Sequence, residues 1–184
     1  EVESTGESEF GNPPKAGQAG AGKVIKRKYP KKQETYYFEG GVSSYVLHIN
    51  KNKDQLNYPP FYSIKTVDAM TIEVAIQYTD AFNENVLTFA NGIYTPDGGM
   101  HLTGFRTALT RALNDYARKN GLLKDNDENL SGDDVREGLT AIVSLKHPAP
   151  QFEGQTKAKL GNPEARTAVD SVVAEGLKIY LEEN

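Results

Sequence analysis

A short polar segment in the last quarter of the chain carries the residues best suited to binding a phosphate. The sequence QFEGQTKAKLG, residues 151–161, places Gln155, Thr156 and Lys157 between two glycines, and Lys159 follows two positions later. A lysine ammonium can place a point charge on a phosphate oxygen, and a glutamine amide can donate a hydrogen bond beside it. A solvated turn with almost no apolar anchor would have the same composition. Residue chemistry alone favours the solvated turn, because Lys157 could bind a nucleotide only by completing a site formed mostly elsewhere.

Two other segments resemble binding loops but lack a residue that the chemistry requires. GQAGAGKV, residues 17–24, matches the start of a phosphate-binding loop, but Val24 stands where that loop needs a serine or threonine for magnesium. DNDEN, residues 125–129, resembles the start of a calcium loop, but Leu130 and Arg136 replace its glycine and its bidentate glutamate. We therefore expect neither a nucleotide pocket nor a calcium site in these segments.

The remaining titratable residues form no complete catalytic set in the sequence. His48, His101 and His147 are far apart along the chain, which contains no cysteine and no nucleophile elbow. Asp133 and Asp134 could act as a pair of catalytic carboxylates, but adjacent acids at the start of a helix usually cap it. We expect no metal site, and we interpret the two acids as capping residues.

The composition is that of a soluble globular protein, with 38% hydrophobic and 25% charged residues among 184. A formal net charge of −4 argues against a protein that coats nucleic acid, so any such contact would need a local basic patch. The sequence has no apolar run long enough for a membrane span, and its first ten residues are too acidic for a signal peptide. Together with the lack of cysteine, these features predict a cytoplasmic location.

The chain divides into two parts by composition. Residues 1–35 are rich in glycine, proline and charged residues without apolar periodicity, which predicts a flexible linker or insertion. Within it, residues 23–32, KVIKRKYPKK, hold six basic residues in ten, and they are either a solvated segment or an arm that contacts nucleic acid. Residues 36–184 are expected to form one ordered domain.

The spacing of apolar residues in this domain predicts both helices and strands. In the helix over 101–119, Leu102, Phe105 and Leu109 form the buried stripe, and Arg106 lies off it. The last helix begins after Asn162, an expected cap, with Pro163 in its first position. Strands that pair with each other and helices that pack on them indicate an α+β fold in two layers. The predicted helices are 42–49, 101–119, 131–139 and 163–182, and the predicted strands are 61–67, 72–78 (half-buried), 86–90 and 140–146.

Four stretches of this domain together resemble one known family. They are YYFEGGVSSYVLHIN, GGMHLTGFRTALTRALNDYA, GDDVREGLTAIVSLKHPAPQFEGQTKAKLGN and the closing helix. These blocks are similar to the transducer domain of the B subunit of bacterial type IIA DNA topoisomerases, which gyrase and topoisomerase IV share, and gyrase is favoured. The resemblance runs from about Tyr36 to Asn184. It implies a ribosomal-protein-like fold in which helices back a mixed sheet and a long helix ends the domain.

The resemblance also implies roles for three residues. In this family the Gln-Thr-Lys loop reaches into the adjoining GHKL ATPase domain and contacts the γ-phosphate of ATP. This implies that Gln155 and Lys157 bind the nucleotide and that Lys157 is catalytic. Arg106, in the GFR of its block, matches a basic position that lines the cavity through which a DNA segment passes. The implied cofactor is ATP with magnesium, and the implied partners are the ATPase domain, the gyrase A subunit, DNA and a second copy of the whole polypeptide.

The resemblance implies a switch, in which contacts to the γ-phosphate bias the angle between two rigid domains. Residues 1–35 lack the magnesium box and glycine-rich lid of the family's ATPase domain, so we expect this chain to be inactive alone. Two alternatives remain at this point. One is a nucleic-acid-binding module that uses residues 23–32, and the other is an autonomous ATPase, which the missing pocket disfavours.

Overall fold

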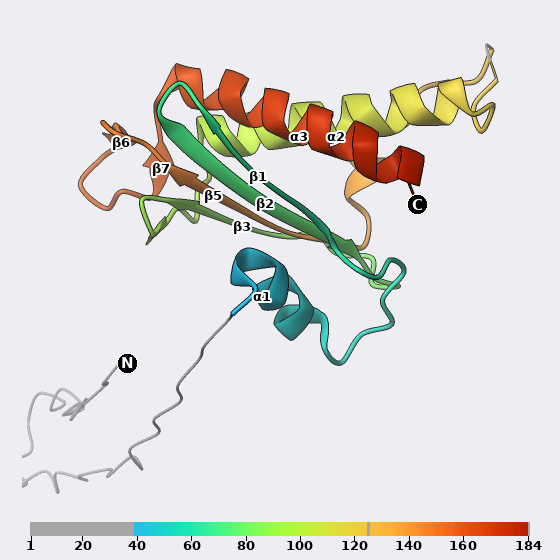
Figure 1. Cartoon of the computed structure of the whole chain (residues 1–184), viewed down its shortest axis with the longest axis horizontal. Helices are drawn as coiled ribbons and strands as arrows, with labels where there is room; N and C mark the ends of the chain where they lie inside the picture. Colours follow the sequence, from blue (N-terminus) through green and yellow to red (C-terminus); the bar gives the residue numbers. More distant parts are fainter. Residues whose placement is uncertain (1–38, 125, 184) are drawn as a thin grey trace, which may run out of the picture. The chain divides into compact units, whose positions relative to one another are not determined.

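The computed structural model describes residues 39–124 and 126–183, and in this part a five-stranded sheet is covered by helices on both faces (Figure 1). The expectations for residues 1–35 lie outside the described residues. The α+β class and the mixed sheet are confirmed. The elements are α1 (Gly41–Asn50), β1 (Phe61–Val67), β2 (Met70–Tyr78), β3 (Asn85–Ala90), β4 (Ile93–Tyr94), α2 (Met100–Lys119), the 3₁₀ helix η1 (Asp134–Arg136), β5 (Leu139–Lys146), β6 (Phe152–Glu153), β7 (Lys159–Leu160) and α3 (Pro163–Glu183).

The sheet has the strand order β1-β2-β5-β3-β4, so the last long strand in the sequence occupies its centre. β5 pairs antiparallel with β2 and parallel with β3. A parallel pair needs a long crossover connection, and α2 supplies it between β3 and β5. The segment between β2 and β3 is therefore not the turn of a hairpin, because β5 lies between these two strands.

The helix α1 covers a face of the sheet that the two-layer prediction left open. Val46 packs there against Ala75 of β2 and Ile142 of β5. Gln77, on the same face of β2, is also buried and accepts a hydrogen bond from Asn50 at 3.0 Å. The predictions of two layers and of a half-buried β2 were wrong for the same reason. The apolar side of α1 packs on the second face of β2 and β5, so these central strands are buried on both faces. The arrangement has three layers (Figure 1).

The larger core lies on the opposite face, where α2 and α3 pack side by side on the sheet (Figure 1). Gly104 of α2 allows this close packing, because a Cβ atom there would lie 2.3 Å from the backbone oxygen of Arg166 in α3. The buried set of α3 agrees with the helical periodicity of the sequence. Its members are Ala165, Ala168, Val169, Val172, Val173 and Leu177.

The predicted helix over 131–139 is reduced to the short η1. Its first turn is closed by a reciprocal pair of bonds: the Ser131 N–H donates to the Asp134 carboxylate at 2.7 Å, and the Asp134 N–H donates to Ser131 Oγ at 3.2 Å. These hydrogen bonds lower the pKa of the Asp134 carboxyl. The capping interpretation is thereby confirmed for Asp134 but not for Asp133, whose side chain makes no capping hydrogen bond and pairs with Arg136. None of the helices in the described residues is both long and apolar enough to span a membrane.

Candidate functional site

Residues 151–161 form a small hairpin, here called the arm, between β5 and α3. Its strands β6 and β7 pair antiparallel, with Phe152 opposite Leu160 and Glu153 opposite Lys159. Lys159 Nζ lies 3.1 Å from a Glu153 carboxylate oxygen, which is an exposed cross-strand ion pair of small energetic value. Lys159 is thus occupied within the arm, whereas the Gln-Thr-Lys triplet lies in the connection between the two strands.

The tip of the arm exposes Gln155, Thr156 and Lys157. Lys157 has a φ of 54°, in the left-handed region that costs a residue other than glycine about 1–3 kcal/mol. Its ammonium lies 5.8 Å from the centre of the Phe152 ring, within range of a cation–π contact. The tip therefore presents an amide and an ammonium to solvent from a constrained backbone.

The arm has apolar anchors, which contradicts the interpretation of this segment as a turn without them. Leu160 is fully buried in the main core, and Phe152 packs against that core. The two residues are opposite each other in the hairpin and so point to the same side. The sequence did not reveal this, because strands of two residues are too short for any periodicity.

One side of the arm is bonded to the start of α2. The Leu160 N–H donates to Gly98 O at 2.9 Å, and the Asp97 N–H donates to Ala158 O at 3.0 Å. Gly99 has a φ of 127°, and a Cβ atom there would lie 2.2 Å from Leu160 O. Only glycine fits this position, so β7 can run directly beside the residue that precedes α2.

The other side of the arm is held by the residue before α3. Asn162 was expected to cap this helix, but its side-chain oxygen accepts the Gln151 N–H at 2.6 Å. Its amide nitrogen donates to Ala149 O at 3.3 Å and to the Glu164 carboxylate at 2.8 Å. The hydrogen bond from Asn162, assisted by the Glu164 backbone and by His147, lowers the pKa of the Glu164 carboxyl. Sequence reasoning missed this role, because an asparagine before proline is also a common helix-start signal.

The three histidines are placed by the structure in different elements. His48 lies in α1, His101 in the first turn of α2, and His147 directly after β5. Burial lowers the pKa of His101 to about 4, and its Nε2 lies 3.1 Å from the Thr95 hydroxyl. Within the described ranges, no group of three or more potential ligands is placed to hold a metal ion.

Arg106 lies off the buried stripe of α2, as its position in the sequence predicted. Its side chain is 41% exposed, and its Nε and Nη2 lie 3.1 and 2.8 Å from one oxygen of Glu84. Arg136 contacts the other oxygen of Glu84 at 3.3 Å. One turn and a half further along α2, Arg111 forms a two-bond pair with Asp170 of α3, at 2.7 and 3.2 Å. Each of these three guanidiniums is therefore already paired with a carboxylate.

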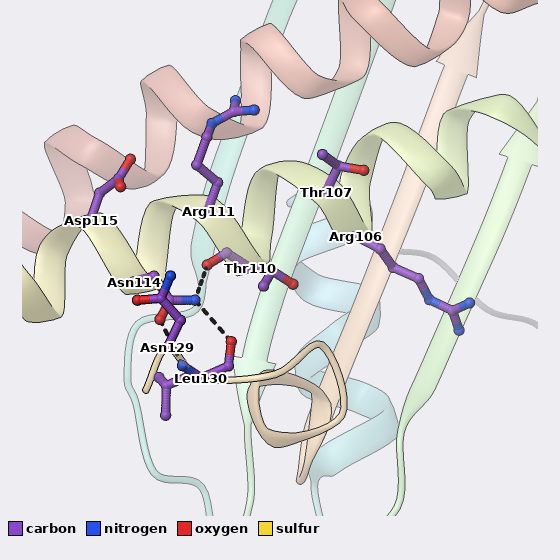
Figure 2. A pocket seen from close by; sticks show the side chains of 8 residues that line it. All are labelled: Arg106, Thr107, Thr110, Arg111, Asn114, Asp115, Asn129 and Leu130. Carbon is purple, nitrogen blue, oxygen red and sulfur yellow. Dashed lines mark hydrogen bonds between the residues drawn. The ribbon is translucent and has the colours of Figure 1, made fainter. Parts of the chain in front are cut away.

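Arg106 and Arg111 line an open depression of about 560 Å³ on the exposed side of α2 (Figure 2). Figure 2 shows that Thr107, Thr110, Asn114 and Asp115 come from the same helix, whereas Asn129 and Leu130 come from the loop after it. The Asn114 side chain bonds this loop to the helix. Its amide nitrogen donates to Leu130 O at 3.0 Å, and its amide oxygen accepts the Leu130 N–H at 2.8 Å. The depression is thus a helix face bordered by a fixed loop, and it is well supplied with hydrogen-bond donors.

Comparison with known proteins finds relatives of this domain. The family model for DNA gyrase B matches residues 41–184. The DNA gyrase B protein from Streptococcus pneumoniae is 55% identical over 159 residues, which are 86% of this chain and 24% of that protein. The 43K ATPase domain of Thermus thermophilus gyrase B, solved in complex with an aminocoumarin, superposes with a TM-score of 0.76. The two sequences are 47% identical, and the superposition covers 84% of this chain and 41% of the Thermus thermophilus chain.

A topoisomerase IV ATP-binding domain from Francisella tularensis is also similar, but less so. Its TM-score is 0.68 at 28% identity, over 84% of this chain and 41% of its own. The chain spans about a quarter of the length of most of the curated relatives that it matches. The family match over most of the chain and the high identity to gyrase B relatives agree with each other. The chain therefore belongs to the DNA gyrase B family.

Proposed function

We propose that this chain is the transducer region of a gyrase B protein, which senses the γ-phosphate of ATP and couples its hydrolysis to DNA strand passage and supercoiling. Gln155 and Lys157 at the tip of the arm are the residues that contact the γ-phosphate. In the complete subunit, ATP and magnesium are held mainly by a GHKL ATPase domain. The further partners in this proposal are the gyrase A subunit, a DNA segment and a second copy of gyrase B, all in the cytoplasm.

The observation that carries this proposal is the geometry of the arm. Lys157 is exposed at a backbone conformation that side chains other than glycine rarely adopt, at the tip of a hairpin whose base is buried. Strained residues on a well-fixed support are typical of sites that contact a ligand. The donors here are an ammonium and an amide, which suit an anion with several oxygens. Short hairpin turns often contain one left-handed residue, but this position is usually glycine or asparagine, and an ordinary surface turn would not need a lysine there.

The mechanism follows from what each residue can do toward a terminal phosphate. The Lys157 ammonium supplies a positive charge where negative charge redistributes during phosphoryl transfer, and Gln155 donates a hydrogen bond beside it. Both contacts depend on the γ-phosphate, so they favour one arrangement of the two domains before hydrolysis and release it afterwards. The base of the arm is bonded to the starts of α2 and α3, so a shift of the tip reaches both long helices.

The contact with DNA in this proposal uses Arg106. Its side chain lines the same depression on α2 as Thr107 and Thr110 (Figure 2). Arginine forms two-bond pairs with phosphate as readily as with carboxylate. A DNA phosphate could therefore replace Glu84 as the partner of Arg106 when a segment passes.

The test of the proposed function is Lys157→Ala in the complete subunit. Steady-state ATP turnover should fall by about a hundredfold, which corresponds to roughly 3 kcal/mol, because one fixed charge is removed from the transferred group. Nucleotide binding should stay within a few-fold of the parent, since most ground-state contacts belong to the ATPase domain. Lys157→Arg should also lose most of its turnover, because a planar fork does not replace a compact point charge.

Lys159→Ala is the matched control for this experiment. Lys159 is in the same arm but outside the Gln-Thr-Lys triplet, and its exposed pair with Glu153 contributes little. Its turnover should stay within a few-fold of the parent. Parental turnover of the Lys157→Ala variant would mean that the tip is a solvated turn.

A further inference from the structure

The base of the arm is held by a connected set of partly buried polar contacts that the proposed function does not yet use. Asn162 is only 2% exposed and His147 8%, and both are adjacent to Glu164. The Asn162 side chain bonds to the segment that leads from β5 into the arm at two points, the Gln151 N–H and Ala149 O. Buried amides with every contact satisfied specify one local arrangement, because any alternative leaves a polar group without a partner.

The support behind Asn162 is itself fixed in orientation. The Ala149 N–H donates to His147 Nδ1 at 3.0 Å, so the ring proton is on Nε2, which lies 3.0 Å from the same Glu164 oxygen that accepts from Asn162. The backbone of His147 is held in turn by Asn91, whose side chain accepts the His147 N–H at 2.7 Å and donates to His147 O at 2.9 Å. The end of β5, the base of the arm and the start of α3 are thus joined through one carboxylate.

We propose that Asn162 is a positioning residue for the tip of the arm, supported by Glu164 and His147. Asn162 lies five residues from Lys157 in sequence, and its side-chain bonds go to the base of the arm and not to the tip. It fixes the direction in which β6 leaves the base, and the Gly161 N–H bond to Gln151 O at 2.7 Å closes the hairpin just above it. This inference rests on the proposed function, because the position of the tip affects ATP turnover only if the tip contacts the γ-phosphate.

The consequence concerns turnover and not binding. A short hairpin with an unfixed base would sample several directions, and its tip would meet the phosphate in the productive position for only part of the time. Misplacement of a catalytic group by about 1 Å can cost up to roughly a hundredfold in rate. Loss of Asn162 should therefore lower kcat in the complete subunit while the affinity for nucleotide is retained.

The chain offers a matched control in Asn114 of α2. Its amide also bonds both backbone groups of a neighbouring loop residue, Leu130, and it is nearly as buried at 7% exposed. Asn162→Ala and Asn114→Ala thus remove equivalent contacts of the same residue type, one at the base of the arm and one at a loop remote from it. A general loss of stability would affect both variants.

The first measurement is amide hydrogen exchange on this chain, which does not depend on ATP hydrolysis. In Asn162→Ala, the amides of Gln151 and Gly161 should exchange about tenfold faster or more, with β5 amides unchanged. In Asn114→Ala, the Leu130 amide should lose protection, whereas those of Gln151 and Gly161 should keep it. Equal protection of Gln151 and Gly161 in the two variants would overturn the role of Asn162 at the base of the arm.

The second measurement is ATP turnover and nucleotide affinity of the same variants in the complete subunit, with Lys157→Ala alongside. We expect Asn162→Ala to lower kcat by roughly ten- to a hundredfold at unchanged affinity, and Lys159→Ala, the control used above, to keep the basal rate. Glu164→Gln retains the oxygen that accepts from Asn162 and His147, so its kcat should stay near that of the parent. If any disturbance of this corner lowered the rate, Glu164→Gln would be slow as well. A reduced rate in Lys157→Ala with a parental rate in Asn162→Ala would overturn the positioning role alone. Parental rates in both would overturn the proposed function and the positioning role with it.

Discussion

The buried His101 should make the stability of this domain sensitive to mild acid. The ring is fully buried, its Nδ1 has no hydrogen-bond partner in the described part of the chain, and burial lowers its pKa from 6.5 to about 4. In the folded domain the ring stays neutral until the pH approaches 4, whereas in the unfolded chain it binds a proton below about 6.5. The unfolded state thus binds more protons between these values, and the free energy of unfolding falls as the pH is lowered through this window.

The size of the effect follows from the shift. Each unit of pKa difference corresponds to about 1.4 kcal/mol, so His101 alone should remove about 3 kcal/mol of stability between pH 6.5 and pH 4. Urea unfolding of this chain at several pH values measures the loss. In His101→Gln this part of the slope should disappear, whatever offset the substitution causes at pH 7.

Other groups also lose favourable contacts in acid, and the comparison of the two proteins separates them from His101. The pKa values of Asp134, Glu164 and Glu182 are lowered by their hydrogen bonds, so their contributions are lost as the pH falls through those lowered values. These three residues are present in the parent and in His101→Gln alike, so their effect cancels in the difference. Parallel curves for the two proteins from pH 7 to pH 4 would refute the reasoning about His101.

Three further predictions concern α2 and its contacts. Arg106→Gln in the complete subunit should weaken DNA-stimulated ATP turnover more than basal turnover, and Glu84→Gln, which weakens the competing pair, should shift stimulation to lower DNA concentrations. Turnover measured against DNA concentration checks both, and curves identical to the parent would leave Arg106 an ordinary surface residue. Gly104→Ala should destabilise the domain by about 1–3 kcal/mol, because the new methyl group meets the Arg166 backbone oxygen. An unchanged melting temperature would show that α2 and α3 separate easily at this point.

The helices of this domain could be predicted from sequence because their signals are local. The apolar stripes of α2 and α3 repeat every three or four residues, and Pro163 marks the start of α3. The burial of Ala75 and Gln77 could not be predicted in the same way. It depends on α1, which lies about thirty residues earlier in the sequence and is too short to indicate which face it covers.

The candidate site also has a part that could be predicted from the sequence and a part that could not. Gln155 and Lys157 were found by resemblance to a family, since residue chemistry alone favoured a solvated turn. The hairpin that carries them was not predicted, because β6 and β7 are two residues long. The role of Asn162 depends on contacts with Gln151 and Ala149 that only the folded chain creates. Pairing of backbone groups across a corner leaves no pattern of residue types in the sequence.

The place of β5 at the centre of the sheet bears on how this chain folds during synthesis. Its two neighbours, β2 and β3, are complete by Ala90, but β5 is not finished until Lys146. Until the ribosome has added those residues, two apolar strands have no partner along their facing edges, and such edges are prone to pair with other chains. Non-local pairing of this kind is also slow, because a long loop must close before any ladder forms. A nascent chain that pauses between these two points would therefore be most exposed to aggregation and most dependent on chaperones.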